Sequence, residues 1–329
     1  MKPYPDQELP TRDDVVAAHR FIGPYLPPTP LVRAHSLSQQ LGFDYWVKCE
    51  NAQPVGAFKV RGGVNLLGNL DGGVKRLGVV TASTGNHGQS IAYAGGLFGI
   101  PVIIYAPERN VNPVKMQAMR DLGADVRLFG RDFDEARGEV ERVAAAEGMR
   151  YVHSGNEPLL IAGVGTIGLE IAGALPDVEV IIVPVGGGSG VCGTALAVKE
   201  QRPAIRIIGV QSASAPACRE AWKTGNLKVE CAMKTDHEGL ATRVPFAMTM
   251  QLMWELLDDF LLVTDAEINE SIRLLARHTR QLAEGAGAAA TAAALKLREE
   301  LRGKRVAGVL SGGNLPLGRL AGLFAGSES

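Results

Sequence analysis

The sequence VEVIIVPVGGGSG, which occupies residues 178–190, decides the fold class of this chain. It opens with an apolar run of strand length, Val178–Val185, and continues into four glycines and one serine. A continuous apolar run bounded by glycine is typical of a strand buried on both faces of a parallel sheet. Glycine has no Cβ, so the backbone of residues 186–190 can turn sharply and approach a ligand closely. The stretch predicts a buried strand, a ligand-binding turn and the start of a helix.

Other apolar runs alternate with amphipathic segments from about residue 78 onward. Strand–helix alternation at this spacing predicts βαβ units and parallel sheet. Asp132 and Asp265 precede two helical patterns, and we expect their carboxylates to cap those helices. Prolines between residues 24 and 30 favour extended loops over long helices in the first 75 residues. The remaining apolar runs are 77–82, 101–105, 125–129, 205–210, 260–263 and 306–310, and the helical patterns are 112–122, 132–146, 265–277 and 284–301. The runs form two clusters, 78–155 and 156–329.

Composition excludes several classes of function. Lys and Arg number 34 against 35 Asp and Glu, a net charge of −1, so we expect no nucleic-acid partner and no polybasic membrane surface. We also expect no membrane span, because no apolar run approaches about 18 residues. The 4 cysteines form no CxxC pair, which removes support for zinc knuckles and thioredoxin chemistry. The polar start of the sequence shows no signal-peptide pattern, so we expect a cytoplasmic protein.

Three glycine-containing loops each follow a predicted strand and precede a predicted helix: residues 83–88 (STGNHG), 186–190 and 311–314 (SGGN). Helix starts present unpaired N–H groups and a positive dipole end, which suit an anion. The pattern GxGxxG occurs at 188–193, but the next strand ends without the acidic residue that dinucleotide sites need. A second match, at 163–168, lies inside an apolar helical segment and indicates close helix packing. Residues 186–190 therefore predict a site for a single phosphate group.

Lys59 is the candidate for covalent chemistry. It lies between Phe58 and Val60, in a segment followed by two glycines. An amine in an apolar pocket loses its proton more easily and can form a Schiff base with an aldehyde. Together with a phosphate-binding loop, Lys59 predicts pyridoxal phosphate as the cofactor.

The order of these motifs resembles fold type II pyridoxal-phosphate enzymes. The residues that carry the resemblance are FKVRG at 58–62 and the three loops, and the whole chain is similar to the serine/threonine dehydratase and serine racemase branch. The resemblance implies an α/β protein of two open, mostly parallel twisted sheets flanked by helices, with the cofactor in the cleft between two domains. Residues 78–155 would form a small mobile domain, and residues 1–77 with 156–329 a large cofactor-binding domain. Further similar stretches are NEP at 156–158, EGL at 238–240 and EGAG at 284–287.

The resemblance also implies a role for each site residue. Lys59 would hold the cofactor and move the substrate Cα proton, with Ser83 and Thr84 as the other catalytic residues. The substrate carboxylate would bind at the start of a helix. For that carboxylate the residues are Ser83, Thr84, Gly85, Asn86 and His87, and for the cofactor they are Phe58, Lys59, Asn86, Gly186, Gly187, Gly188, Ser189, Gly190, Gly239, Glu284 and Ser311.

The implied activity is the dehydration and deamination of a β-hydroxy α-amino acid to a 2-oxo acid and ammonia, by a homodimer. Serine, threonine, 3-hydroxyaspartate and phenylserine all stay open as substrates, as do Arg137 and Arg243 as partners of a second carboxylate. His153 is expected to be structural. The racemases of this branch have a serine where this chain has Thr84, which disfavours racemisation; a racemase or β-replacement enzyme is the alternative, and a nicotinamide-dependent oxidoreductase is the remote one. The turn at 211–217 contains no carboxylate, so we expect no divalent metal site.

Overall fold

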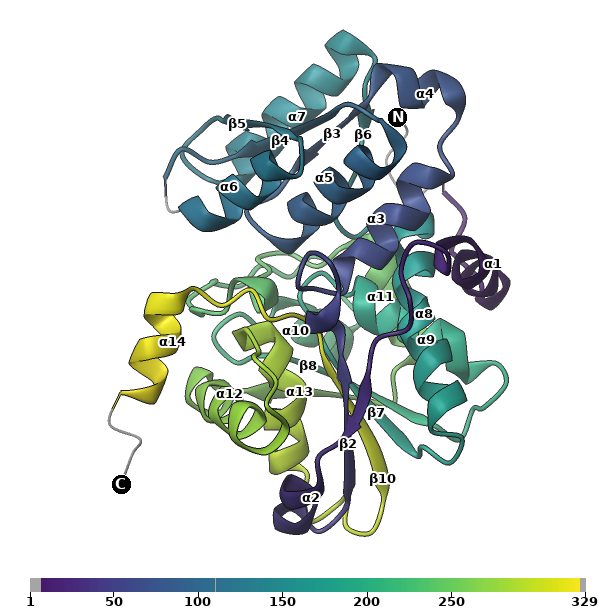
Figure 1. The fold of residues 1–329 in the computed structure, drawn as a ribbon, viewed down its shortest axis with the longest axis vertical. Coiled ribbons are helices and arrows are strands. Elements are labelled where there is room, and N and C mark those ends of the chain that lie inside the picture. The colour runs from purple at the N-terminus through teal and green to yellow at the C-terminus, as the bar shows by residue number, and fades with distance from the viewer. Residues whose placement is uncertain (1–6, 110, 326–329) are drawn as a thin grey trace.

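The computed structural model describes residues 7–109 and 111–325. The chain forms two α/β halves, each built on its own sheet, and Figure 1 shows the four-stranded half above the six-stranded half. The six-stranded sheet comprises β1 (Leu31–Arg33), β2 (Asp44–Cys49), β7 (Val180–Pro184), β8 (Arg206–Ser212), β9 (Asp259–Val263) and β10 (Arg305–Leu310). The four-stranded sheet comprises β3 (Val79–Ala82), β4 (Val102–Ala106), β5 (Asp125–Leu128) and β6 (Arg150–Tyr151).

The larger sheet has the order β1-β2-β10-β7-β8-β9, and its neighbouring strands are parallel except for the antiparallel pair β1 and β2. Alternate side chains of β7 enter two different hydrophobic clusters. Ile181 and Val183 pack on one face, and Val180 and Ile182 pack on the other. Burial of both faces explains why this strand reads as an unbroken apolar run. The predicted fold class, with two mostly parallel sheets flanked by helices, is confirmed.

The smaller sheet is fully parallel, with the order β5-β4-β3-β6. It also has two covered faces: Val79 and Ile104 lie in one cluster, and Val80 and Ile103 in another. Each of the seven apolar runs predicted as a strand contains or overlaps a strand of the structure.

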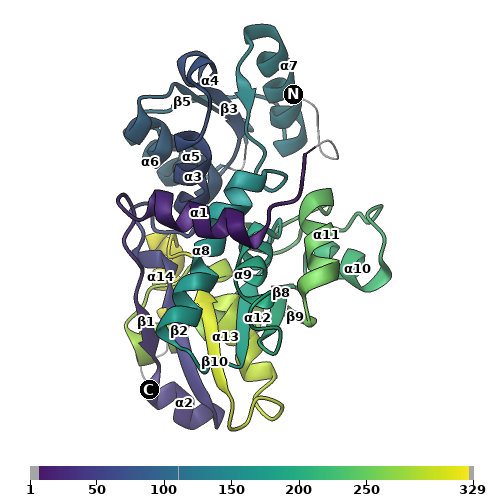
Figure 2. The ribbon, with the colours of Figure 1, turned by 90° about the vertical axis from the view of Figure 1, so that its right-hand side faces the viewer.

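Helices cover both sheets and connect them. α3 packs against α5 of the smaller half and against α8 of the larger half, and Figure 2 shows α1 and α8 at the same junction. The helices are α1 (Arg12–Ile22), α2 (His35–Leu41), α3 (Lys59–Gly68), α4 (Gly72–Leu77), α5 (Asn86–Phe98), α6 (Pro113–Asp121), α7 (Phe133–Glu147), α8 (Pro158–Ala174), α9 (Ser189–Lys199), α10 (Ala217–Thr224), α11 (Ala247–Leu256), α12 (Asp265–Thr279), α13 (Gly285–Lys296) and α14 (Leu317–Phe324), with short 3-10 turns η1 (Glu50–Ala52) and η2 (Glu238–Leu240).

Two local predictions are wrong in instructive ways. Asp132 caps α7 as predicted, but α12 is capped by Thr264, whose hydroxyl accepts from the Glu267 N–H in a reciprocal capping box. Asp265 is the first helical residue instead. Pro24 lies in the turn that follows α1, and Pro27, Pro28 and Pro30 lie in the loop after it, yet α1 and α3 form on either side of this segment. α1 begins at a capping box made by Thr11 and Asp14. This helix-start pattern was not used in the prediction for the first 75 residues.

Candidate active site

Parallel strands bring the predicted loops together. β7 and β10 are neighbours in the larger sheet, so the loops that follow them, residues 186–190 and 311–314, open at the same edge. The third loop, residues 83–88, follows β3 in the smaller sheet and faces them across the junction. The loops 83–88 and 311–314 are in direct contact, because Asn86 accepts from the Asn314 amide at 2.8 Å. The segment at the start of α3 contacts the other two loops: the Phe58 N–H donates to the Ser311 carbonyl at 3.0 Å, and the Lys59 ammonium donates to the Ser189 hydroxyl.

Lys59 is the first residue of α3, and its side chain is partly buried between the two halves. The ammonium donates to the Ser189 hydroxyl at 2.8 Å and to the Ser154 carbonyl at 3.2 Å. No carboxylate pairs with it in these contacts. Burial lowers the pKa of Lys59 to about 8, because desolvation penalises its charged form. A fraction of this amine is therefore neutral near neutral pH, as a nucleophile or a proton acceptor requires.

The glycine loop after β7 is packed too closely against its neighbours to accept side chains at two of its positions. A Cβ on Gly186 would lie 2.3 Å from the Gly239 carbonyl oxygen, and one on Gly187 would lie 2.4 Å from the Phe246 ring. Gly188 has φ +96°, in the left-handed region that favours glycine. No side chain caps the start of α9, so its first N–H groups stay available beside Ser189. The loop therefore offers backbone N–H donors at the start of a helix, as a phosphate group requires.

The loop before α5 is held by its own serine. The Ser83 hydroxyl accepts from the backbone N–H groups of Gly85 (3.2 Å) and Gly88 (2.8 Å), while its proton stays free to donate to a ligand. Thr84 is partly exposed at the same turn. His87 is buried, and its Nε2 lies 3.0 Å from the Thr81 hydroxyl. Burial lowers the pKa of His87 to about 3, with Lys59 adding to the effect, so the imidazole is neutral at physiological pH.

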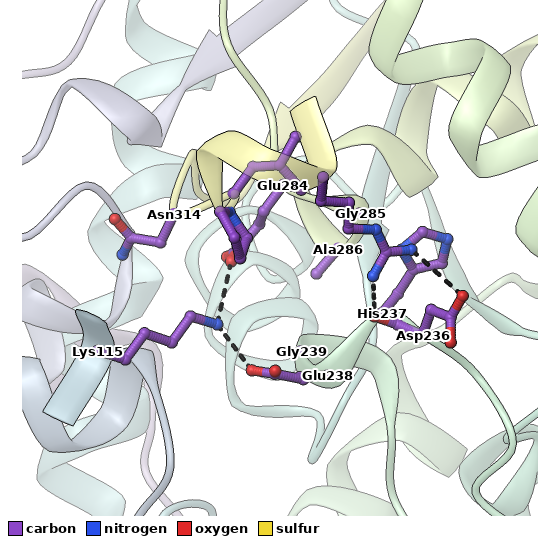
Figure 3. A pocket seen from close by; sticks show the side chains of 12 residues that line it. Lys115, Asp236, His237, Glu238, Gly239, Glu284, Gly285, Ala286 and Asn314 are labelled. Carbon is purple, nitrogen blue, oxygen red and sulfur yellow. Dashed lines mark hydrogen bonds and ion pairs between the residues drawn. The ribbon is translucent and has the colours of Figure 1, made fainter. Parts of the chain in front are cut away.

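Asn86 and Glu284 meet on the other side of the junction. Asn86, the first residue of α5, donates from its side-chain amide to Glu284 Oε1 at 2.5 Å. The backbone of Gly312, in the loop 311–314, packs against the same carboxylate. Ser311 is 6 % exposed at the end of β10, and Gly239 lies against Gly186. Figure 3 shows Glu284, Asn314 and Gly239 around one pocket, together with Lys115 and Glu238. Sequence reasoning missed Lys115, because nothing in its local pattern separates it from a solvated lysine.

The two arginines considered as partners of a second carboxylate differ in exposure. Arg137 lies 3.5 Å from Asp134 one turn away on α7, and Arg243 is exposed. His153 accepts at Nδ1 from the backbone N–H groups of Gly155 and Asn156, both at 3.0 Å, as expected of a structural histidine. Within residues 7–109 and 111–325, no three His, Cys, Asp or Glu side chains gather as a metal would require. In the same residues, no helix is long and apolar enough to cross a membrane.

Comparison with known proteins matches this geometry to a family. The family model described as pyridoxal-phosphate dependent enzyme matches residues 22–312, which include Lys59, the loops 83–88 and 186–190, and the first two residues of the loop 311–314. The chain belongs to this family. Pyridoxal phosphate is its cofactor, as we predicted from Lys59 and the glycine loop at residues 186–190.

Curated relatives narrow the class of enzyme. An L-threonine ammonia-lyase of Geobacter sulfurreducens is 41 % identical over 288 residues, covering 87 % of this chain and 71 % of that protein. A catabolic L-threonine dehydratase of Staphylococcus aureus is 38 % identical over 315 residues, covering 94 % and 91 %. These similarities confirm the prediction of a pyridoxal-phosphate-dependent ammonia-lyase.

Solved structures agree on the fold. The processed form of threonine deaminase isoform 2 from Solanum lycopersicum has a TM-score of 0.90 and 31 % identity, covering 95 % of this chain and 91 % of that one. Maize serine racemase also has a TM-score of 0.90, with 29 % identity and coverage of 97 % and 99 %. A lyase and a racemase therefore share this architecture, so the fold alone does not distinguish the two activities.

Proposed function

We propose that the protein converts L-threonine or L-serine to a 2-oxo acid and ammonia. The observation that carries this proposal is Lys59, a partly buried amine beside the phosphate-shaped loop at the start of α9. Bound pyridoxal phosphate supplies an electron-withdrawing ring that acidifies the Cα–H of an amino acid attached to it. The threonine ammonia-lyase and dehydratase relatives support a β-hydroxy substrate. In the net reaction the α-amino group leaves as ammonia, and the water lost from Cβ and Cα is balanced by the water that hydrolyses the imine.

We assign the cofactor to the loops that meet at Lys59. Residues Gly186, Gly187, Gly188, Ser189 and Gly190 hold the phosphate through backbone N–H groups and the Ser189 hydroxyl. Phe58 would lie beside the cofactor; its side chain packs against the same loop, 3.2 Å from the position that a Cβ would take on Gly190. Asn86, Glu284, Gly239 and Ser311 would line the remaining ring positions, and Lys59 would be the residue that holds the cofactor through its aldehyde.

We assign the substrate carboxylate to the start of α5. The Ser83 hydroxyl proton, the Thr84 hydroxyl and the N–H groups of Asn86 and His87 lie at the positive end of this helix, and Gly85 is its N-cap residue. His87, neutral because of its burial, adds no charge that would hold the carboxylate too tightly. Lys59 takes the Cα proton, for which its lowered pKa of about 8 provides a neutral amine.

A panel of β-hydroxy amino acids tests this assignment. Threonine or serine should give 2-oxo acid and ammonia in equal amounts without an added nucleophile. 3-Hydroxyaspartate should be poorer, because Arg243 is exposed and Arg137 lies 3.5 Å from Asp134, so neither is a free partner for its second carboxylate. Phenylserine is tested in the same panel. Chiral chromatography of the remaining substrate measures racemisation in the same tubes. Formation of the opposite enantiomer without release of ammonia would contradict the lyase activity and would favour the racemase activity, which Thr84 disfavours.

The division into domains belongs to the same proposal. Residues 78–155 form the small unit that closes on substrate, and residues 1–77 with 156–329 form the larger one. The packing of α3 against both α5 and α8 supports α3 as the connection about which they move. A homodimeric assembly and a cytoplasmic location stay predictions.

Gly186→Ala should weaken cofactor binding. The added methyl would meet the Gly239 carbonyl oxygen at 2.3 Å, so either the phosphate loop or η2 has to shift. We expect the dissociation constant for pyridoxal phosphate to rise by about tenfold or more, equivalent to at least ~1.4 kcal/mol. Titration of apoenzyme with cofactor measures it. Gly173→Ala, at a glycine with open space around its Cβ position, is the control and should bind as wild type does.

EDTA should leave activity unchanged. Hard divalent cations need several oxygen ligands, preferably charged, and the turn at 211–217 offers no carboxylate. Ammonia release is measured after dialysis against EDTA and again after adding magnesium or manganese. A loss that only a divalent ion restores would contradict this expectation.

A further inference from the structure

Lys115 reaches from one half of the molecule to the other. It lies on α6, which packs with the smaller sheet, and only 11 % of its side chain is exposed. Its ammonium donates to Glu238 of η2 at 2.8 Å and lies 3.9 Å from Glu284, at the start of α13. Figure 3 shows the three side chains converging across the mouth of the pocket. The ammonium also lies 3.8 Å from the position that a Cβ would take on Gly85.

The two carboxylates that share this lysine differ in their surroundings. The Glu238 side chain is 55 % exposed, whereas that of Glu284 is 9 % exposed. Water screens the first pair, so its contribution is small. A buried carboxylate depends strongly on the nearest cation, because little water is present to stabilise its charge. Lys115 therefore matters most for Glu284, although Glu238 makes the shorter contact.

Glu284 in turn orients Asn86. Its Oε1 accepts from the Asn86 Nδ2 at 2.5 Å, and the Asn86 Oδ1 accepts from the Asn314 Nδ2 at 2.8 Å. Both ends of the amide are fixed, which selects one of its two flipped orientations. A protonated Glu284 would be a weaker acceptor and would present a competing O–H.

The charged groups around Glu284 come from three elements. Lys115 comes from α6, Asp236, His237 and Glu238 come from η2 and the residues before it, and Arg319 comes from α14. Arg319 donates to the Asp236 carbonyl and lies 3.4 Å from His237, so its charge is engaged away from Glu284. Burial raises the pKa of Glu284, Lys115 and the Asn86 amide lower it again, and Glu238 raises it further. Lys115 is thus the cation that opposes the effect of burial on Glu284.

We propose that Lys115 is a positioning residue whose charge, acting through the carboxylate of Glu284, fixes the Asn86 amide for the cofactor ring. This inference rests on the proposed assignment of Asn86 to the ring. Lys115 touches neither cofactor nor substrate in this role. Since the lysine and Asn86 belong to one half and Glu284 to the other, the arrangement forms only when both halves are together.

The test is cofactor affinity as a function of pH in Lys115→Met. Without the lysine, Glu284 takes up a proton at a higher pH, so the variant should bind the cofactor well in alkali and lose affinity as the pH falls. As the pH falls, we expect its dissociation constant to rise more steeply than that of wild type, by about tenfold for each unit by which the pKa of Glu284 differs between the two proteins. Comparison with wild type cancels the titration of the cofactor itself. Absorbance titration of apoenzyme gives the constants without any substrate.

Three variants separate positioning from packing. Lys115→Arg keeps the charge and should follow wild type. Glu238→Gln removes only the exposed partner and should change the pH ratio less than about threefold. Lys115→Met with Glu284→Gln has no carboxylate at position 284, so its pH ratio should return to that of wild type. If Lys115→Met does not fold, as judged by circular dichroism, Lys115→Gln takes its place.

Two results would overturn the proposal. One is a Lys115→Met variant whose affinity falls equally at every pH, which is what a purely structural role produces. The other is a double variant that keeps the pH dependence. Neither result depends on which amino acid the enzyme converts, so failure of this inference is distinguishable from failure of the proposed function in the substrate panel.

Discussion

Lys59→Ala should fold, should still bind pyridoxal phosphate through the loop at 186–190, and should lose at least about 1,000-fold in ammonia release. The amine is placed for both of its proposed tasks, at 2.8 Å from Ser189 of the phosphate loop and with its pKa lowered by burial. The variant should also lose the visible absorbance of lysine-bound cofactor. Borohydride reduction of the wild-type holoenzyme, followed by peptide mass spectrometry, should place the cofactor on the peptide that contains residue 59.

Lys304→Ala is the matched control. That lysine pairs with Glu179, and 49 % of its side chain is exposed, so activity should not change. Turnover by Lys59→Ala at the wild-type rate would remove this residue from the chemistry. Reduction that labels another lysine would identify the group that acts in its place.

Arg61→Met should destabilise the protein by about 3–5 kcal/mol, which for a chain of this size lowers the melting temperature by on the order of 10 °C. Arg61 follows Lys59 by two residues on α3 and is fully buried. Its guanidinium bonds Glu50 at 2.7 Å and Glu170 at 2.5 Å. Lys48, which also contacts Glu170 at 2.5 Å, balances the cluster at two positive and two negative charges. Removing one cation leaves a buried carboxylate without its partner.

Arg33→Met provides the comparison at an exposed pair. Arg33 lies 2.6 Å from Asp44, yet 45 % of its side chain is exposed, so its loss should cost less than about 1 kcal/mol. Thermal unfolding of both variants, followed by circular dichroism, measures the difference. Equal melting temperatures for Arg61→Met and wild type would show that desolvation of the cluster cancels its attraction.

Local signals found the parts of the site that depend on backbone shape. The loops at 83–88, 186–190 and 311–314 could be recognised because the strand, the glycine turn and the helix start follow one another in one continuous stretch of sequence. Lys59 could be singled out because its neighbours in the chain are apolar and glycine-rich. Gly163–Gly168 was correctly interpreted as close helix packing: a Cβ on Gly163 would lie 2.6 Å from the Arg61 carbonyl oxygen. The cap of α12 was misassigned because Thr264 and Asp265 are both good capping residues, and only backbone conformation separates them.

Contacts between residues that are far apart in the chain could not be predicted from the sequence. Lys115 and Glu238 are 123 positions apart, and Asn86 and Glu284 are 198 apart. Arg61 and Glu170 come from different helices, and each alone has the pattern of an ordinary surface charge. The residues adjacent to each of these side chains in the chain do not indicate whether it will be exposed to water or buried.

The sequence by itself determined the α/β class, the phosphate-shaped loop and the lysine, because each follows from the conformational freedom and hydrophobicity of neighbouring residues. The tertiary structure alone decided that Lys115 lies opposite Glu284 and that Arg61 is buried among carboxylates. The energy of a charge depends on the solvent and the charges around it, and those are set by which elements pack together rather than by which residues are adjacent in the chain.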